Sequence, residues 1–364
     1  MQANRENDQT IWLKNKGLVQ VIDQRHLPFE FIIRDLRTLD DAYQAIADMV
    51  VRGAPLIGVT ASFGIYLALM EEKNQEGWAR RLEASADYLR SARPTAVNLS
   101  YAIDRQLETI DTSATLEQAR EQALVTAQKL KKQEKENCRL IGEHGMPLIR
   151  EISEKKGGEP VHILTHCNAG WLATVEHGTA TAPIYRAHQE GIPVHVWVDE
   201  TRPRNQGARL TAWELEQRGV PYTVIADNTG GLLMQKGMVD MVIVGSDRTT
   251  ATGDVANKIG TYLKALAARD NNIPFYAALT RSTIDRNISN GVKEIPIEQR
   301  KEEEVKYIEG YSEGSFRKVL LTPKKSRVAN YGFDVTPAAY VTSLITEKGL
   351  CKPTKQAIEK LFES

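Results

Sequence analysis

Short apolar runs recur through the second half of the chain, and a polar segment follows each of them. The runs are VHILT (161–165), PVHVWV (193–198), PYTVIA (221–226), DMVIVG (240–245) and IPFYAAL (273–279). Amphipathic patterns such as LTAWELEQRG and IGTYLKALAARD lie between most of them. Strands that alternate with helices in this way predict a parallel sheet covered on both faces. A later run, KVLLTP (318–323), is a further candidate strand.

In the first half of the chain, apolar residues recur at the spacing that is typical of helices and not of strands. After Thr38 the apolar positions recur at helical spacing, and residues 76–90 and 114–153 repeat this amphipathic pattern. The N-terminal runs TIWLKNKGLVQVIDQ and FEFIIRDL alternate like short strands. The break KKGGEP (155–160) separates the two halves. We therefore predict an α/β protein, with a smaller, mainly helical domain with short strands at 1–155 and a Rossmann-like catalytic domain with a parallel sheet at 156–364.

Residues 53–70 form a run of 18 positions without a charge, which reaches the lower limit for a membrane-spanning helix. The run also contains three glycines, a proline, a threonine and a serine, so we expect a buried helix. The first ten residues are polar and charged, which is not typical of a signal peptide. Three cysteines are too few for a disulfide framework and indicate a reducing compartment. We expect a cytoplasmic protein that does not contact a membrane.

Composition narrows the class of function. The 364 residues include 47 basic and 47 acidic side chains, so the formal net charge is zero. An apolar fraction of 41% excludes global disorder. No basic excess exists to attract nucleic-acid backbones, and we predict no nucleic-acid partner.

Ligands of open parallel sheets bind beyond the carboxyl ends of the strands. The segments after the five strands are THCNAG (165–170), DETRPRNQG (199–207), ADNTGG (226–231), GSDRTTATGD (245–254) and TRSTIDR (280–286). All five are polar, small or charged. One such segment would mean little because loops are polar anyway, but five of them predict one composite site.

Two of these segments carry reactive side chains. Cys167 precedes a predicted helix start, where backbone amides would lower the pKa of its thiol and favour acid–base or nucleophilic chemistry. The alternative is a small core residue. Asp247 leaves an apolar strand, where desolvation would raise the pKa of its carboxyl group and suit it to proton transfer. The alternative is a carboxylate that caps the following turn.

Several segments are suited to an anion. In GDVANKIG, Asn257 and Lys258 would place an amide and an ammonium group at a helix start. Arg52 precedes a predicted tight turn and helix start, and Arg93 precedes a proline. Arginine binds phosphate through its planar fork, although surface arginines and ordinary helix caps are the alternatives. The histidines lack metal-ligand spacing, so we predict no metal site. His166 adjoins Cys167, but neighbouring strand residues face opposite sides and direct pairing is not expected.

The motifs together resemble the methylthioribose-1-phosphate isomerase family. This family shares its fold with ribose-1,5-bisphosphate isomerases and with regulatory subunits of the eukaryotic translation-initiation guanine-nucleotide exchange factor. The matching motifs are VRGAPLIG (51–58), SARPTAVNLSYA (91–102), ILTHCNAGWLAT (163–174), ETRPRNQGARLTAWEL (200–215), VGSDRTTATGDVANKIGTY (244–262) and FDVTP (333–337). The resemblance implies that Cys167 and Asp247 are the catalytic pair. It implies that the substrate- and phosphate-binding residues are Arg52, Gly53, Ala54, Arg93, Gln206, Asn257 and Lys258.

The same resemblance implies an aldose–ketose isomerase that converts 5-methylthioribose 1-phosphate to 5-methylthioribulose 1-phosphate in methionine salvage, without cofactor or metal, as a homodimer. The chain departs from many relatives at Trp171, at Tyr331-Gly332 and in the ADNTGG turn, which could reshape the pocket around the 5-substituent of the sugar. Three alternatives stay open: a substrate such as 5-deoxyribose 1-phosphate or ribose 1,5-bisphosphate, a non-catalytic regulatory subunit, and a nicotinamide-dependent dehydrogenase. The presence of both Cys167 and Asp247 argues against the regulatory subunit. The absence of a dinucleotide fingerprint argues against the dehydrogenase.

Overall fold

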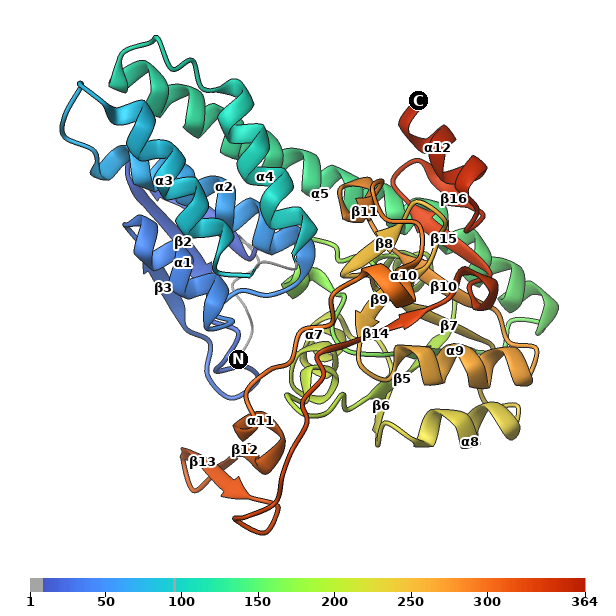
Figure 1. Cartoon of the computed structure of the whole chain (residues 1–364). Helices are drawn as coiled ribbons and strands as arrows, with labels where there is room; N and C mark the ends of the chain where they lie inside the picture. Colours follow the sequence, from blue (N-terminus) through green and yellow to red (C-terminus); the bar gives the residue numbers. More distant parts are fainter. Residues whose placement is uncertain (1–8, 94–95, 364) are drawn as a thin grey trace.

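The computed structural model describes residues 9–93 and 96–363 (Figure 1). The polar segment 1–8, Pro94 and Thr95 lie outside the described residues, and so does the centre of the SARPTAVNLSYA motif. In the described part the chain is a mixed α/β protein, as predicted.

The N-terminal part combines a small antiparallel sheet with a helical bundle. The sheet has the order β1 (Ile11–Asn15), β2 (Leu18–Ile22), β3 (Ile33–Leu36). The helices are α1 (Leu39–Ala47), α2 (Ala54–Glu71), α3 (Trp78–Arg90), α4 (Val97–Thr109) and α5 (Leu116–Lys155). Helix α1 begins where predicted because Thr38 and Asp41 form a reciprocal capping box. The predicted strands and helices of this half are confirmed.

Helix α2 is formed by the charge-free run. Among the described residues it is a helix long and apolar enough to cross a membrane, and 83% of it is buried inside the protein. It packs against α1, α3, α4 and α5 in one apolar core. The expected buried helix is confirmed. Helix α2 carries apolar residues on every side because other helices surround it.

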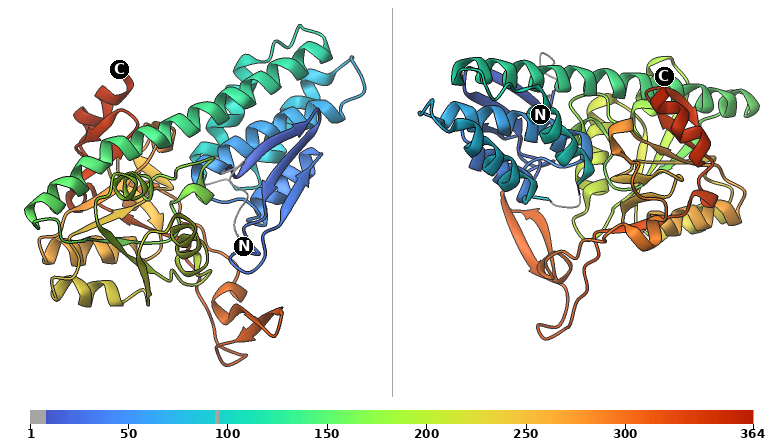
Figure 2. Two further views of the ribbon diagram at one scale, coloured as in Figure 1. Left: turned by 180° about the vertical axis from the view of Figure 1, so that it is seen from behind. Right: turned by 45° about the horizontal axis from the view of Figure 1, so that its top comes forward.

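Helix α5 belongs to both parts of the molecule, and Figure 2 shows it running along the two. Ala119, Ala123 and Ala127, near its start, lie in the core of the N-terminal part. Ile141 and Ile149, near its end, lie in the core beneath the large sheet. One continuous helix therefore links the two cores.

The second part is built on a seven-stranded sheet. Six strands are parallel: β4 (Val161–Thr165), β5 (Val194–Asp199), β6 (Tyr222–Ile225), β7 (Met241–Val244), β10 (Phe275–Ala278) and β15 (Ser343–Thr346), with β16 (Gly349–Cys351) antiparallel at one edge. The order β16-β15-β10-β7-β4-β5-β6 reverses direction between β4 and β7. This is the topological switch point, where doubly wound sheets bind ligands. All five predicted strands are confirmed.

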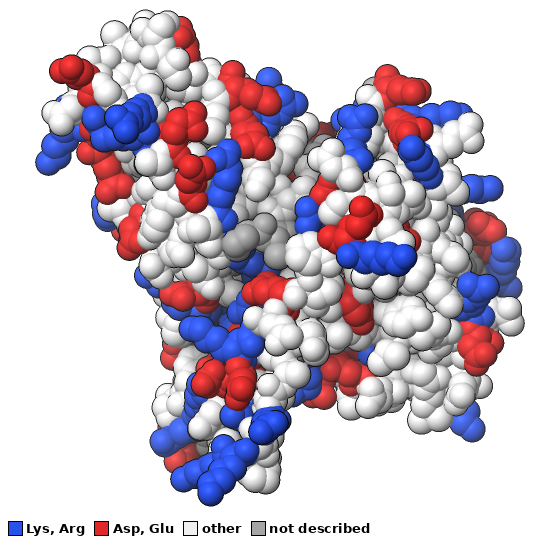
Figure 3. All heavy atoms as spheres, in the orientation of Figure 1, with Lys and Arg blue, Asp and Glu red and all other residues white. Residues whose placement is uncertain are grey.

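Helices cover both faces of this sheet. Helices α6 (Ala182–Gln189) and α7 (Ala212–Arg218) share one face with the end of α5. Helices α8 (Thr229–Gln235), α9 (Thr261–Asp270) and α12 (Lys355–Glu363) cover the other. The surface carries charges of both signs side by side (Figure 3), as a net charge of zero leads one to expect.

One sequence expectation in this part is wrong. Asn257 and Lys258 lie on strand β9 (Val255–Lys258), not at a helix start, because α9 begins three residues later. Strand β9 belongs to a small sheet of order β11 (Ile284–Asp285), β8 (Arg248–Thr250), β9, β14 (Phe333–Thr336). The run KVLLTP contributes to β13 (Ser315–Leu320), which pairs with β12 (Tyr307–Ser312) in a separate hairpin. The strand expected from this run is therefore confirmed, although it lies outside the main sheet. Its consecutive residues Arg317, Lys318 and Val319 are exposed, which does not suit a parallel sheet buried on both faces.

Candidate active site

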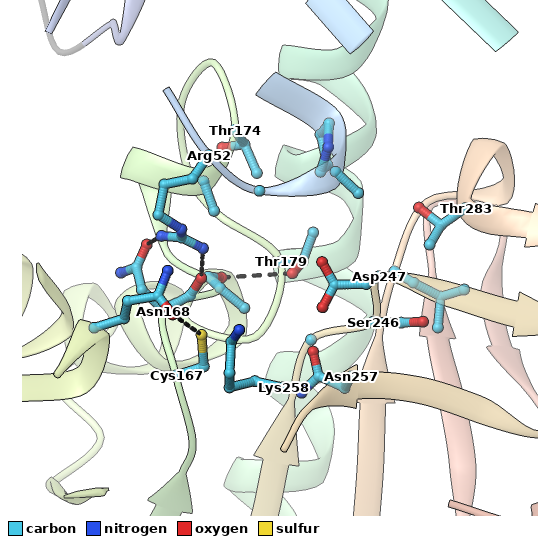
Figure 4. A pocket seen from close by; sticks show the side chains of 18 of the residues that line it. Arg52, Cys167, Asn168, Thr174, Thr179, Ser246, Asp247, Asn257, Lys258 and Thr283 are labelled. Atoms are coloured by element: carbon cyan, nitrogen blue, oxygen red, sulfur yellow. Dashed lines mark hydrogen bonds between the residues drawn. The ribbon is translucent and has the colours of Figure 1, made fainter. Parts of the chain in front are cut away.

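A pocket lies at the switch point, between the carboxyl ends of β4 and β7 and the start of α2. All nine predicted site residues line it: Arg52, Gly53, Ala54, Arg93, Cys167, Gln206, Asp247, Asn257 and Lys258. Figure 4 labels Arg52, Cys167, Asp247, Asn257 and Lys258 among the side chains around the pocket. We call the group from the second part (Cys167, Gln206, Asp247, Asn257, Lys258) the sheet wall. We call the group from the first part (Arg52, Gly53, Ala54, Arg93) the helix wall. Four of the five polar strand-end segments contribute; ADNTGG does not.

Cys167 is held in an uncommon backbone conformation on the sheet wall. Its φ is +64°, in the left-handed region that a side chain disfavours. Its amide donates to Oγ1 of Thr201 (2.8 Å), and its carbonyl accepts from Oγ1 of Thr211 (2.6 Å). Its Sγ donates to Oε1 of Gln206 (3.4 Å). These bonds on every side fix where the thiol points.

The predicted helix start after Cys167 is wrong. The chain continues into a loop and the short turn η1 (Trp171–Ala173), and the next α-helix begins at Ala182. Burial raises the pKa of the Cys167 thiol above its usual range, while Arg52 and Lys258 act in the opposite direction. At neutral pH the group is therefore a thiol and not the expected low-pKa thiolate.

Asp247 follows β7, as expected. Burial raises the pKa of its carboxyl group, and the cations Lys258, Arg93 and Arg52 oppose this shift. The predicted direction is confirmed. Its amide donates to the carbonyl of Ala256 (2.9 Å), but within residues 9–93 and 96–363 its carboxylate accepts no hydrogen bond. The side chain is thus available to a ligand and does not cap a turn.

Strand β9 supplies the amide and ammonium groups of the sheet wall. Nδ2 of Asn257 donates to Oγ1 of Thr261 (3.0 Å), and this bond fixes the orientation of the side-chain amide of Asn257. Burial lowers the pKa of Lys258, while Cys167 and Asp247 raise it. Its Nζ lies 4.8 Å from the ring centre of Phe333 on the neighbouring strand β14. A buried ammonium group with few fixed partners is suited to an anionic ligand.

The helix wall depends on a close backbone contact. Gly53 precedes α2 with a φ of +90°, and a Cβ there would lie 2.4 Å from the carbonyl oxygen of Ala173. Only glycine allows this approach. It brings the free amides of the first turn of α2, from Ala54 on, to the pocket. The predicted turn and helix start are confirmed.

The two arginines of the helix wall are held differently. Arg52 donates both to Oδ1 and to the carbonyl oxygen of Asn168, which lies directly after Cys167. Arg93 has a looser partner, since its guanidinium lies 3.5 Å from a carboxylate oxygen of Glu298. Among the residues that the structure describes, its Nε is buried without an acceptor, and burial lowers the pKa of the Arg93 guanidinium. An unsatisfied buried donor at the pocket wall points to a ligand oxygen.

Sequence reasoning missed two residues that hold the site together. Glu214 of α7 is fully buried and accepts from Nδ2 of Asn168 (2.9 Å) and from the hydroxyl of Tyr185 (2.9 Å). It also accepts from the amides of Trp171 and Leu172 (3.0 and 2.8 Å). Asn168 lies inside the polar segment THCNAG, and the position of this segment after a strand already indicated a place near the site. The sequence did not indicate a role for Glu214, because a glutamate within a helix usually faces solvent.

Trp171, Tyr331 and the ADNTGG turn, which we expected to reshape the pocket around the 5-substituent, do not contact the pocket directly. Trp171 is buried against Trp213, and Tyr331 is 49% exposed. The apolar part of the lining comes instead from Met49, Ala54, Pro55, Ala169, Ala173, Leu279 and Phe333.

One cluster has the composition of a cation site. His166, Asp199 and Asp227 offer ligand atoms within 4.8 Å of one another. The ammonium group of Lys264 already lies 3.2 Å from Oδ2 of Asp199. His166 bonds to Asp199 and not to Cys167, so the expected divergence of the two neighbours is confirmed. The protein thus supplies its own cation at this cluster.

Comparison with known proteins shows the family to which the chain belongs. Residues 50–353 match the family model described as the initiation factor 2 subunit family. The chain belongs to this family. Among its curated relatives is the methylthioribose-1-phosphate isomerase of Desulfosudis oleivorans, 55% identical over 97% of this chain and 96% of the relative. Another is the isomerase of the same name from Brucella anthropi, 53% identical over 100% and 99%.

Solved structures of the family agree. The 5-methylthioribose 1-phosphate isomerase of Pyrococcus horikoshii OT3 superposes with a TM-score of 0.83 at 39% identity, covering 98% of this chain and 96% of that one. The translation initiation factor eIF-2B subunit delta of A. fulgidus gives 0.79 at 36% identity, covering 98% and 99%. The resemblance drawn from the motifs is therefore confirmed, both for the isomerases and for the regulatory relatives.

Proposed function

We propose that the protein is an aldose–ketose isomerase that converts 5-methylthioribose 1-phosphate to 5-methylthioribulose 1-phosphate. One observation carries this proposal. A thiol, a carboxyl group with a raised pKa and three cations from both walls line one pocket at the switch point. The names of relatives at 53–57% identity over nearly the whole chain support the same reaction.

The cations are suited to a phosphate group. Arg52, Arg93 and Lys258 face Asp247 from three segments of the chain, so the pocket has an excess of positive charge. Two guanidinium groups offer planar donors, and the first turn of α2 adds backbone amides. A phosphate bound here would fix C1 and C2 of the sugar in the pocket.

The thiol and the carboxyl group divide the proton transfers. Because C1 carries the phosphate, the ring cannot open as a free hemiacetal does, and opening requires a proton at the ring oxygen. Hydrogen then moves from C2 to C1 by one of two routes. In the first, the group that has given its proton to the ring oxygen takes the C2 proton as a base, and the other group delivers a proton to C1 of the enediol-like intermediate. In the second, the hydrogen shifts directly as a hydride. Asp247 and Cys167 both keep a proton more readily than their free counterparts, which suits an acid at the ring oxygen or at carbon. No metal or organic cofactor enters this scheme.

The pocket lining favours a neutral 5-substituent. Its apolar side chains include Met49, Leu279 and Phe333, and the lysine and arginine side chains among its described lining residues are Arg52, Arg93 and Lys258. A second phosphate would need its own cations, which argues against ribose 1,5-bisphosphate. We propose 5-deoxyribose 1-phosphate as a further substrate on the same ground.

We also propose a cytoplasmic homodimer with domains at 1–155 and 156–364, in which movement of the helix wall toward the sheet wall excludes water. The three cysteines are free and buried, which agrees with a reducing compartment. The surface charge and the absence of a basic excess support a small-molecule partner and no nucleic acid.

The test is a phosphorus and proton NMR assay of the purified protein with 5-methylthioribose 1-phosphate, 5-deoxyribose 1-phosphate and ribose 1,5-bisphosphate in parallel. We expect a ketose 1-phosphate from the first two sugars without added metal or nucleotide. Turnover of the bisphosphate alone would reassign the substrate. Binding without turnover of any sugar would support a regulatory subunit and contradict the proposal.

A further inference from the structure

A second cavity adjoins the candidate active-site pocket, and arginines line it. Met49, Arg52 and Gln206 line both cavities, so these three side chains form the boundary between them. The other lining residues of the second cavity are Gln24, Arg25, Arg204, Arg209 and Leu210. No aspartate or glutamate is among the described residues that line it. We call this second cavity the arginine cavity.

A surface groove adjoins the arginine cavity in turn. Arg204 and Arg209 line both of them. The groove runs beside the hairpin of β12 and β13, which lies apart from the large sheet in Figure 1. Glu309 and Lys318 of this hairpin line the groove and are exposed, so the groove is open to solvent. Groove, arginine cavity and pocket therefore form a series in which each shares lining residues with the next.

Arg209 is held in place by the N-terminal part of the chain. Its Nε donates to the carbonyl oxygen of Leu27 (3.1 Å), and its Nη2 donates to that of Arg25 (2.5 Å). Its Nη1 lies 3.7 Å from a carboxylate oxygen of the exposed Glu309. Two backbone carbonyls thus fix the plane of the guanidinium group, and the Nη1 donors remain available to a ligand.

Arg204 and Arg25 are paired with acids along one edge only. Nη1 of Arg204 donates to Oε1 of Glu304 (2.9 Å), and its Nε and Nη2 donate no hydrogen bond within residues 9–93 and 96–363. Arg25 donates through Nε and Nη2 to the carboxylate of Asp23 (2.9 and 2.7 Å), which leaves its Nη1. Planar guanidinium groups with remaining donors are suited to a phosphate group.

The charges around the arginine cavity leave a positive excess. Four guanidinium groups line it, and they stay protonated because arginine does not lose its proton in proteins. The three acids that pair with them are Asp23, Glu304 and Glu309, and none of these lines the cavity. Glu304 is also shared with Arg300 (2.8 Å), which weakens its hold on Arg204. An anion in the cavity would therefore meet more positive than negative charge.

We propose that Arg25, Arg204 and Arg209 form a second phosphate-binding site, which receives the phosphate group of the sugar phosphate on its way from the surface groove to the pocket. The sugar phosphate as ligand rests on the proposed isomerase function, whereas the binding of a phosphate group does not. Entry to the pocket requires a movement at the boundary. Met49 is suited to this movement because its side chain is unbranched and flexible.

The first experiment measures kcat/KM for 5-methylthioribose 1-phosphate at low and high ionic strength. Arg204→Gln should lower kcat/KM by about tenfold at low ionic strength, with a smaller change in kcat, and by less than about twofold at high ionic strength, because salt screens the attraction. Arg186→Gln is the matched control, since Arg186 lies on α6, pairs with Glu190 (2.9 Å) and lines none of the three cavities. It should retain the kcat/KM of the wild type at both ionic strengths.

Two further variants separate charge from structure. Arg204→Lys keeps the charge and should recover most of the lost kcat/KM at low ionic strength. Glu309→Gln removes an exposed carboxylate beside Arg209 and should raise kcat/KM by about twofold under the same conditions. Losses of similar size in Arg204→Gln, Arg204→Lys and Glu309→Gln would show a structural role of these contacts and overturn the proposal.

The remaining outcomes also decide. Wild-type kcat/KM in a folded Arg204→Gln protein at low ionic strength, or a loss of equal size at both ionic strengths, would overturn the proposal. Turnover of ribose 1,5-bisphosphate that is lost in Arg204→Gln would mean that the site holds a second phosphate of the substrate, and the entry role would be wrong.

If the wild type turns over no sugar, the proposed function fails, and the second site is tested by itself. Inorganic phosphate is then titrated into the wild type, Arg204→Gln and Arg186→Gln and followed by phosphorus NMR. Weaker binding in Arg204→Gln alone would support the second site. Equal binding in all three proteins would overturn it.

Discussion

The sheet wall and the helix wall of the pocket are built on different principles. The sheet wall is fixed by the strands and by hydrogen bonds on every side of Cys167. The helix wall meets it through a close glycine contact and through Arg52, whose partner Asn168 is 116 positions away in sequence. Within the described part of the chain, Arg93 makes a 3.5 Å ion pair with Glu298, and its Nε has no acceptor. The contrast indicates that the sheet wall positions the chemistry, whereas the helix wall completes binding.

The largest expected effect lies on the sheet wall. Cys167→Ser and Asp247→Asn should each lower kcat by about 1,000-fold or more, because each removes a group to which the proposed mechanism assigns a proton transfer. Steady-state kinetics together with circular dichroism would check this in a folded protein. Turnover within about tenfold of wild type in either variant would remove that residue from the chemistry.

Arg52→Lys tests the helix wall. A lysine cannot make the two hydrogen bonds that Arg52 makes with Asn168, so we expect KM to rise by about 100-fold with a smaller change in kcat. The measurement is the dependence of rate on sugar phosphate concentration. A loss confined to kcat would mean that the two walls do not divide binding and chemistry.

The reactivity of the Cys167 thiol should depend on pH, and this dependence tests its protonation state on the sheet wall. Because burial raises the pKa of its thiol above the usual value, the thiolate fraction should increase about tenfold per pH unit through pH 9. The alkylation rate by iodoacetamide, followed by mass spectrometry of the peptide containing Cys167, should rise accordingly. A plateau below pH 8 would show a depressed pKa and support the helix-terminus expectation instead.

Glu214→Gln tests how the walls are joined. The carboxylate accepts four hydrogen bonds, and an amide oxygen and amino group cannot replace both carboxylate oxygens. We expect Asn168 and hence Arg52 to shift, with KM raised by about tenfold. Trp171→Phe is the control for this region and should change KM by less than about twofold, because Trp171 does not line the pocket.

The sequence predicted the two walls unequally. The expectation that ligands bind beyond the carboxyl ends of the strands located Cys167 and Asp247, since each lies in the polar segment after an apolar strand and the topology brings these ends together. No local pattern places Arg52 and Arg93 opposite them, and family resemblance alone did so. The conformations around Cys167 and Lys258 were misjudged because a loop and a β-strand stand where helix starts were expected. Glu214 was missed because its burial is a property of the packed fold.

The most direct test of the division between the walls compares Asp247→Asn with Arg93→Gln in one phosphorus NMR experiment that records binding and turnover of 5-methylthioribose 1-phosphate. We expect the two variants to lose different properties. Asp247→Asn should bind the sugar phosphate and leave it unchanged, whereas Arg93→Gln should bind it weakly and still convert it at high concentration. Equal losses of binding and turnover in both variants would contradict the division of roles between the sheet wall and the helix wall.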